Sequence, residues 1–370
     1  MLFRSRGRNI TIGAVIGFLL SCTAVMGTDE YLWIRKNDGE EIKFSTDSTT
    51  GTNGGWKTEN PYNDNNWDKD TATKTYTNNI ELSSNATNGS DGNKGISHGL
   101  RLKGELTGVN FINNGSITGE MSGSGDGYGI YNESAKMGNI ENTGKISGTG
   151  KSAGYGILNS AKMRNIENKN KGTISGVGGN TSGNGYGIDN RGTIEDITNA
   201  GTISGTGATS SSIGIGIDNI GTIGEITNTG EISGSGNGSE GYGIYNRSSM
   251  TSNIDGKITN VGVISGTGKS AGSGTGSGIY NRGTIGEITN TGEISGTGKS
   301  EGSGDGEGYG IYNKSEDNEI GKIINTGIIS GTGSSSSGNG TGSGIYNYKS
   351  EMENITNAGL ISGTDRKSVV

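Results

Sequence analysis

The most regular feature of this chain is an alternation of apolar and polar positions that returns about every thirty residues. In one copy, Ile197, Asn199, Gly201 and Ile203 occupy alternate sites, with small polar residues between them. Such a period of two is typical of a β-strand with one face turned inward. The nine copies end at Ile117, Ile146, Ile174, Ile203, Ile232, Ile264, Ile294, Ile329 and Ile361. Strands that return at this longer interval predict the stacked coils of a solenoid.

A second motif, Gly-Ile-x-Asn, precedes each later copy. It begins at residues 129, 156, 187, 216, 243, 278, 310 and 344. In three places it continues with the alternation of the first motif, as it does from Ile188 to Ile194. We therefore expect at least two related strands in each coil, joined near Glu195 and Asp196. The Gly/Ser-rich remainder, such as residues 205–215, varies in length and is predicted to lie on the outside as a loop.

These patterns divide the chain into regions. Residues 96–363 are predicted to form an all-β, parallel β-solenoid of about nine irregular coils. Residues 28–95 hold all three tryptophans and the only proline. We expect them to form an N-terminal cap that covers the first coil, with a tryptophan-based binding module as the alternative. Residues 364–370 fit neither a strand nor a cap and are expected to be a non-native or fragment-end tail.

The recurring asparagines predict two ladders parallel to the solenoid axis, because an inward amide can pair with the amides above and below it. The first predicted ladder comprises Asn142, Asn199, Asn228, Asn260, Asn290, Asn325 and Asn357. The second comprises Asn132, Asn159, Asn190, Asn219, Asn246, Asn281, Asn313 and Asn347. A glycine follows two residues after each asparagine of the first motif. It predicts a bend where a Cβ atom would clash or φ must be positive.

Composition changes this prediction little. Glycine accounts for 75 of 370 residues and hydrophobic residues for 27%, which alone would favour a disordered, secreted Gly/Ser-rich chain. That alternative gives no reason for Ile, Asn and Gly to keep fixed offsets through nine copies. The charged fraction is an ordinary 18%, so order is the preferred interpretation.

The first 27 residues have the features of a signal peptide. Three arginines precede an apolar stretch from Ile10 to Leu20, and cleavage is expected before Thr28. Alternatively, the residues leading to Cys22 resemble a lipoprotein box, in which case Cys22 would be lipidated. Because Cys22 is the only cysteine, simple cleavage leaves a mature chain without disulfides. Cleavage also takes the net charge from −7 to about −10, which argues against binding to nucleic acid or anionic membranes.

Candidate chemistry is sparse. Asp189 and Asp218 occupy one position of adjacent coils and form the best pair of carboxylates for a β-helix carbohydrate-active enzyme, a lyase or hydrolase. The other coils put Tyr131, Leu158, Tyr245, Tyr280, Tyr312 and Tyr346 there, which indicates a surface column. The single histidine, His98, is expected to face solvent or to cap the first coil. Asp126 and Asp305 lie in only two Gly-rich loops, too few for a calcium-binding β-roll. We predict no catalytic residue, cofactor or metal site.

The signal peptide, the cysteine-free mature region and the repeated Asn-Thr-Gly-Glu-Ile-Ser-Gly at 228–234 and 290–296 together resemble the passenger region of bacterial autotransporters. The resemblance covers about residues 1–363. It implies a right-handed parallel β-helix exported through the periplasm and outer membrane of a diderm bacterium and displayed at the cell surface, often as an adhesin for a host or extracellular ligand. Members normally end in a β-barrel translocator. No such segment follows Ile361, so we expect the natural chain to continue with more coils and a barrel.

Overall fold

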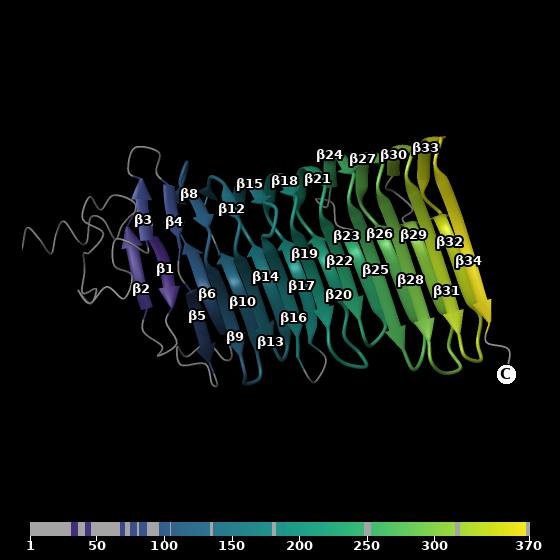
Figure 1. Cartoon of the computed structure of the whole chain (residues 1–370), viewed down its shortest axis with the longest axis horizontal. Coiled ribbons are helices and arrows are strands. Elements are labelled where there is room, and N and C mark those ends of the chain that lie inside the picture. Colours follow the sequence, from purple (N-terminus) through teal and green to yellow (C-terminus); the bar gives the residue numbers. More distant parts are fainter. Residues whose placement is uncertain are drawn as a thin grey trace, which may run out of the picture.

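Three β-sheets, which we call A, B and C, lie along the whole described chain (Figure 1). The computed structural model describes residues 31–35, 41–45, 67–70, 75–79, 81–86, 96–103, 105–133, 136–179, 183–247, 253–314 and 319–367. Every regular element within those residues is a strand. The predicted all-β, repetitive parallel solenoid is confirmed. Such an ordered structure argues against the disordered Gly/Ser alternative.

The strands are given in their spatial order within each sheet. Sheet A contains β2 (Glu41–Ser45), β1 (Tyr31–Arg35), β6 (Ile96–Lys103), β10 (Asp126–Asn132), β14 (Ala153–Asn159), β17 (Asn184–Asn190), β20 (Gly214–Asn219), β23 (Glu240–Asn246), β26 (Gly274–Asn281), β29 (Gly306–Lys314) and β32 (Gly340–Tyr348). Sheet B contains β3 (Trp67–Asp70), β4 (Thr75–Asn78), β8 (Asn110–Asn113), β12 (Ile140–Asn142), β15 (Lys162–Asn168), β18 (Thr193–Asn199), β21 (Thr222–Asn228), β24 (Asn253–Asn260), β27 (Thr284–Asn290), β30 (Glu319–Asn325) and β33 (Glu351–Asn357), with the short strands β7 (Glu105–Leu106) and β11 (Lys136–Met137) beside them. Sheet C contains β5 (Glu81–Ala86), β9 (Ser116–Met121), β13 (Lys145–Gly150), β16 (Thr173–Gly178), β19 (Thr202–Gly207), β22 (Glu231–Gly236), β25 (Val263–Ser270), β28 (Glu293–Ser300), β31 (Ile328–Ser335) and β34 (Leu360–Lys367).

One coil of the solenoid consists of a strand in sheet A, then one in sheet B, then one in sheet C. From β6 to β34 the chain repeats this order through nine consecutive coils, with eight steps between them. Each strand pairs in parallel with its counterpart one coil later. The pairing of β18 with β21, for example, places Asn199 opposite Asn228. Equivalent residues therefore form columns along the axis.

Columns of isoleucine form the interior. In the coil built by β20, β21 and β22, Ile217, Ile223, Ile226 and Ile232 are fully buried, and they belong to one core that continues through the neighbouring coils. Complete burial of such a side chain contributes about 1.5–3 kcal/mol. Because each isoleucine packs against its counterparts in adjacent coils, no coil is an independent folding unit.

Antiparallel strands end the stack on its N-terminal side. Strand β1 pairs antiparallel with both β2 and β6, and β3 pairs antiparallel with β4. Strands β1 to β4 lie within the region in which we predict a cap. Parallel stacking begins earlier than predicted, since β4 and β5 already pair with β8 and β9. Residues 1–27, including Cys22, lie outside the described residues.

The Asn-x-Gly motif is a corner between sheets and not the middle of one strand. Strand β18 ends at Asn199 and β19 begins at Thr202, so the chain turns from sheet B to sheet C around Gly201. A Cβ atom on Gly201 would lie 2.1 Å from the carbonyl oxygen of Gly172 in the preceding coil. Gly201 does not have a positive φ. Of the two reasons predicted for this glycine, close backbone approach is therefore the one that applies.

The Gly/Ser-rich segments are only partly loops, because each supplies a third strand that we did not predict. Residues up to Gly207 belong to β19, and sheet A resumes at Gly214. Sheets A and C approach each other closely here. A Cβ atom on Gly205 would lie 1.9 Å from the carbonyl oxygen of Ile215. The small residues of these segments thus permit two sheets to meet backbone to backbone.

Two further boundaries differ from the prediction. Glu195 and Asp196, where we expect a join between strands, lie inside β18, and both side chains point outward between buried isoleucines. The actual join lies earlier, between Asn190 and Thr193. At the C-terminal side, β34 continues through Lys367 and pairs with β31 along its length. The strand therefore crosses the boundary predicted at residue 363.

Candidate functional site

The first asparagine ladder follows the corner between sheets B and C. In every step, Nδ2 of one asparagine donates a hydrogen bond of 2.8 Å to Oδ1 of the asparagine one coil later. Its members are Asn78, Asn113, Asn142, Asn168, Asn199, Asn228, Asn260, Asn290, Asn325 and Asn357. We did not predict Asn168, because its glycine, Gly172, follows at the fourth position after it instead of the second, nor did we predict Asn78 and Asn113.

The second ladder follows the corner between sheets A and B and contains all eight predicted residues. Its hydrogen bonds measure 2.7–2.9 Å. In both ladders the amide also donates to backbone carbonyls at the turn. Asn199, for example, donates to Gly201 at 3.2 Å and to Glu231 at 2.9 Å. These amides are therefore engaged in closing the corners and are not offered to a ligand.

The outward face of sheet A is the unusual surface of the molecule, because it carries two columns rich in tyrosine. The first outward column consists of His98, Tyr128, Tyr155, Tyr186, Ile215, Tyr242, Ser277, Tyr309 and Ser343. The second consists of Arg101, Tyr131, Leu158, Asp189, Asp218, Tyr245, Tyr280, Tyr312 and Tyr346. Ring centroids of Tyr128, Tyr155 and Tyr186 follow one another at 4.9 Å. Members of both columns form a second apolar cluster, separate from the isoleucine core.

The second outward column is the one that we predict to lie on the surface, and its alignment is as expected. The exposure of two members differs from the prediction, because Asp189 and Asp218 are each only 1% exposed. Nη2 of Arg191 lies 2.8 Å from Oδ2 of Asp189. Arg247, from the following coil, donates two hydrogen bonds of 2.7 Å to Asp218. The two carboxylates are therefore covered by arginines and by the neighbouring tyrosines.

Burial controls the protonation of this pair. Loss of water raises the pKa of Asp218 to about 7, although the hydrogen bonds from Arg247 act in the opposite direction. Burial likewise raises the pKa of Asp189 above its ordinary value, against the hydrogen bond from Arg191. A glycoside hydrolase needs two carboxyl groups that flank a substrate bond. Here both groups are held by protein side chains and are shielded from solvent.

The remaining candidate residues have local partners. His98 is 6% exposed, and its ring centroid lies 5.4 Å from that of Tyr128, on which it stacks. It therefore begins the first outward column, and of its two expected positions the solvent-facing one is wrong. Asp126 accepts a hydrogen bond from the Tyr128 hydroxyl, and Asp305 accepts one from the backbone of Asn339. Among the described residues, no group of three or more His, Cys, Asp or Glu side chains could hold a metal ion.

The first outward column was not predicted, because its tyrosines lie one residue before the Gly-Ile-x-Asn motif and outside it. The sequence does contain its signal: Gly-Tyr-Gly-Ile recurs at 127–130, 154–157, 185–188, 241–244 and 308–311. An outward tyrosine at one fixed position, in coil after coil, predicts an aromatic stack just as the recurring asparagine predicts a ladder.

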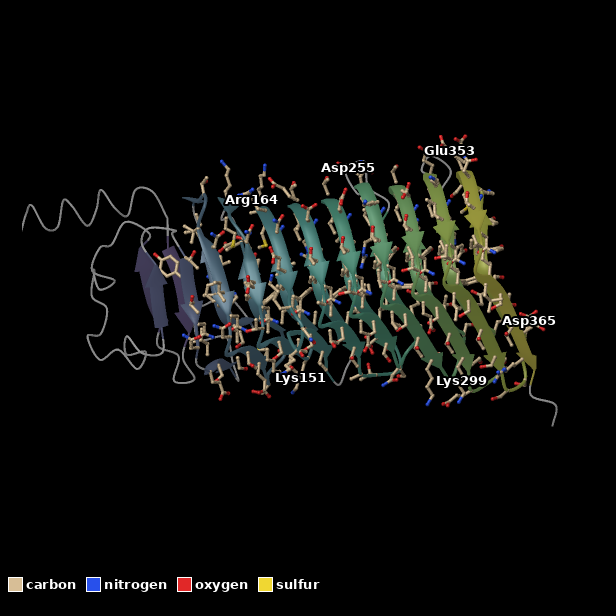
Figure 2. All side chains as sticks on the ribbon, turned by 45° about the horizontal axis from the view of Figure 1, so that its top comes forward. Lys151, Arg164, Asp255, Lys299, Glu353 and Asp365 are labelled. Atoms are coloured by element: carbon tan, nitrogen blue, oxygen red, sulfur yellow. The ribbon has the colours of Figure 1, made fainter. Side chains whose placement is uncertain are left out.

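Charged side chains also project from the two long edges of the stack (Figure 2). Arg164, Asp255 and Glu353 lie at the edge formed by sheet B, Lys151 and Lys299 lie at the opposite edge, and Asp365 lies at the C-terminal end of the stack. Comparisons with models of protein families, with curated proteins and with solved structures gave no match. Within the described part of the chain, no helix has the length and apolar character needed to span a membrane.

Proposed function

We propose that this chain is a non-enzymatic, surface-exposed or secreted autotransporter passenger that serves as an adhesive rod. The observation that carries the proposal is the unbroken column structure. Both asparagine ladders and the isoleucine core continue from coil to coil, so the fold supplies length and stiffness. Variation between coils is greatest in the loops and at outward positions, where a binding surface can change without cost to the core.

The proposal includes an extracellular location and an unidentified ligand on a host surface or in the extracellular medium. An exported rod without disulfides must be stabilised by backbone pairing and packing alone. The parallel ladders and buried isoleucines supply this stabilisation. Nucleic acid is not the proposed partner, because the chain carries a net charge of −7.

The alternative, a carbohydrate-active enzyme, would rely on Asp189 and Asp218. Their position in adjacent coils and the raised pKa of Asp218 are the observations in its favour. Their ion pairs with Arg191 and Arg247 weigh against it, because a substrate would have to displace both arginines. Release of reducing sugars from polysaccharides by the purified chain, abolished in Asp189→Asn and Asp218→Asn, would establish the enzyme instead.

Surface display is the direct test. Residues 1–370 are fused to an outer-membrane β-barrel translocator in a diderm bacterium, and intact cells are treated with protease. We expect the added protease to release solenoid fragments and the displaying cells to adhere to host-cell layers better than cells with the barrel alone. A folded chain that stays protected from protease, or displaying cells that adhere no better than the control, would contradict the proposal.

A further inference from the structure

Three successive coils share the outward motif Tyr-Asn-Arg/Lys. It occurs at 245–247, 280–282 and 312–314. In each copy the asparagine points inward and belongs to the second ladder, while the tyrosine and the cation on either side point outward from sheet A. We call Tyr245, Arg247, Tyr280, Arg282, Tyr312 and Lys314 the tyrosine–cation strip.

The core does not require these cations. Coils that keep the same ladder asparagine have Glu133, Ser160 or Ile220 at the position of the cation. Their asparagines make the same hydrogen bonds along the ladder. A feature confined to three neighbouring coils, on a scaffold that forms without it, indicates a role in binding.

The cations of the strip are held against tyrosines. The Arg247 guanidinium lies 4.8 Å from the centroid of the Tyr245 ring, and its charge is balanced by Asp218. Arg282 is exposed, and its hydrogen bond with the Tyr245 side chain raises its pKa. Nζ of Lys314 lies 5.8 Å from the centroid of Tyr312. Since neighbouring strands are about 4.8 Å apart, positive groups recur at each coil along a straight line.

The tyrosines offer their edges to a ligand and not their faces. Centroids of Tyr245 and Tyr280, and of Tyr280 and Tyr312, are 4.9 Å apart and their rings are stacked. Nucleobases need open ring faces on which to stack, so a single-stranded nucleic acid does not fit. Burial raises the pKa of Tyr312 to about 12. Its hydroxyl therefore remains protonated and can donate a hydrogen bond.

We propose that the tyrosine–cation strip binds a linear acidic polysaccharide that lies parallel to the solenoid axis. Arg282 and Lys314 would pair with its carboxylate or sulfate groups, and the tyrosine edges would meet its hydroxyl groups. On a chain whose net charge is −7, this complementarity of charge is local to the strip. It is also one of repeat, because an extended polymer meets the same groups at each coil. This inference rests on the proposed adhesive function and names its ligand class.

Binding of the full chain to three immobilised polymers tests the inference: heparin, which carries sulfates and carboxylates, polygalacturonate, which carries carboxylates only, and neutral dextran. We expect binding to at least one acidic polymer, none to dextran, and weaker binding as sodium chloride rises. Which acidic polymer binds more tightly identifies sulfate or carboxylate as the group recognised. The double variant Arg282→Ser/Lys314→Ser should bind about tenfold more weakly or worse.

The matched control is Lys162→Ser/Arg164→Ser, which removes the same charge from the outward face of sheet B. It should bind as the original chain does. Tyr312→Phe keeps the ring stack and removes one hydroxyl, and we expect a smaller loss. Equal losses in the strip variant and the control, or no binding to either acidic polymer, would overturn the inference. If the chain is displayed and adhesive yet ignores both polymers, only this inference fails and the proposed function stands.

Discussion

At the scale of single residues, the buried asparagines are the most constrained positions of the fold. Asn228 accepts a hydrogen bond from Asn199, donates one to Asn260, and donates a third to the backbone carbonyl of Val263 at 3.0 Å. It is completely buried. A side chain of similar size without an amide leaves several neighbours without their partners in a site that water does not reach.

Replacing Asn228 by leucine should therefore destabilise the protein far more than the same change at Thr227, which points outward. We expect a loss of about 3 kcal/mol in the free energy of unfolding for Asn228→Leu, because the buried amide of Asn260 loses its donor. For Thr227→Leu we expect a change within about 0.5 kcal/mol. Urea denaturation measures both values. Equal changes in the two variants would contradict the assignment of Asn228 to the inward face and of Thr227 to the outward face.

The buried carboxyl of Asp218 should make stability depend on pH. Its pKa is about 7 in the folded protein and 3.8 ordinarily. Between these values the unfolded chain releases the proton while the folded chain keeps it. The free energy of unfolding should therefore fall as pH rises from about 4 to about 7, by at most about 1.4 kcal/mol per pH unit.

Urea midpoints across this pH range, compared between the original chain and Asp218→Asn, measure the effect. The variant should lose much of the slope, since it has no proton to release at this site. Asp196→Asn, an exposed position on sheet B, makes the same change in charge and should retain the slope. If Asp218→Asn and the original chain show the same pH profile, the buried carboxyl does not titrate as argued.

At the scale of strands and corners, much of the architecture could be predicted from the sequence. The alternation identified the inward isoleucines and the period gave the number of coils, because strict stacking repeats both. The corner at Gly201 was mistaken for strand, since inward and outward positions continue to alternate through the turn. The strand Thr202–Gly207 was not recognised as a strand of its own because its inward residues after Ile203 are Gly205 and Gly207, which give no apolar signal. The tyrosines of the first outward column were not predicted, and the burial of Asp189 and Asp218 in the second was not expected, because outward positions were taken to face water.

A larger side chain at an inward glycine of β19 should strongly destabilise the contact between sheets C and A. At Gly205 a side chain would enter the space between sheets C and A, where the carbonyl of Ile215 lies within 1.9 Å of the Cβ position. Gly205→Val should destabilise the protein by about 3 kcal/mol, because backbone cannot move aside as a flexible side chain can. Thr206→Val, which points outward on the same strand, is the control. Thermal unfolding of both variants is the measurement, and a tolerated Gly205→Val would refute the close contact of the sheets.

At the scale of the whole molecule, the solenoid is a one-dimensional array in which each coil contacts only its neighbours. In sheets A and C the registers are the same at successive steps, and in sheet B they shift within β24, so a given coil can meet another two steps away in nearly the same way as it meets its own neighbour. Val263 pairs with Glu293, and the residues that follow pair in order through Ser270 and Ser300. Stability should therefore depend on the number of coils and on their phase more than on which coil is present.

Deletion of residues 263–292 tests this dependence, because it joins Gly262 directly to Glu293 and removes one complete coil in phase. Every remaining column keeps its inward and outward residues, so we expect cooperative unfolding and a rod shorter by about 4.8 Å in small-angle scattering. Deletion of residues 263–278 removes β25 and most of β26. The chain would then pass from β24 in sheet B directly to the last residues of β26 in sheet A, so that this coil has no strand in sheet C. That variant should lose cooperative unfolding. If the in-phase deletion proves as disruptive as the out-of-phase one, the coils are not interchangeable and the array description fails.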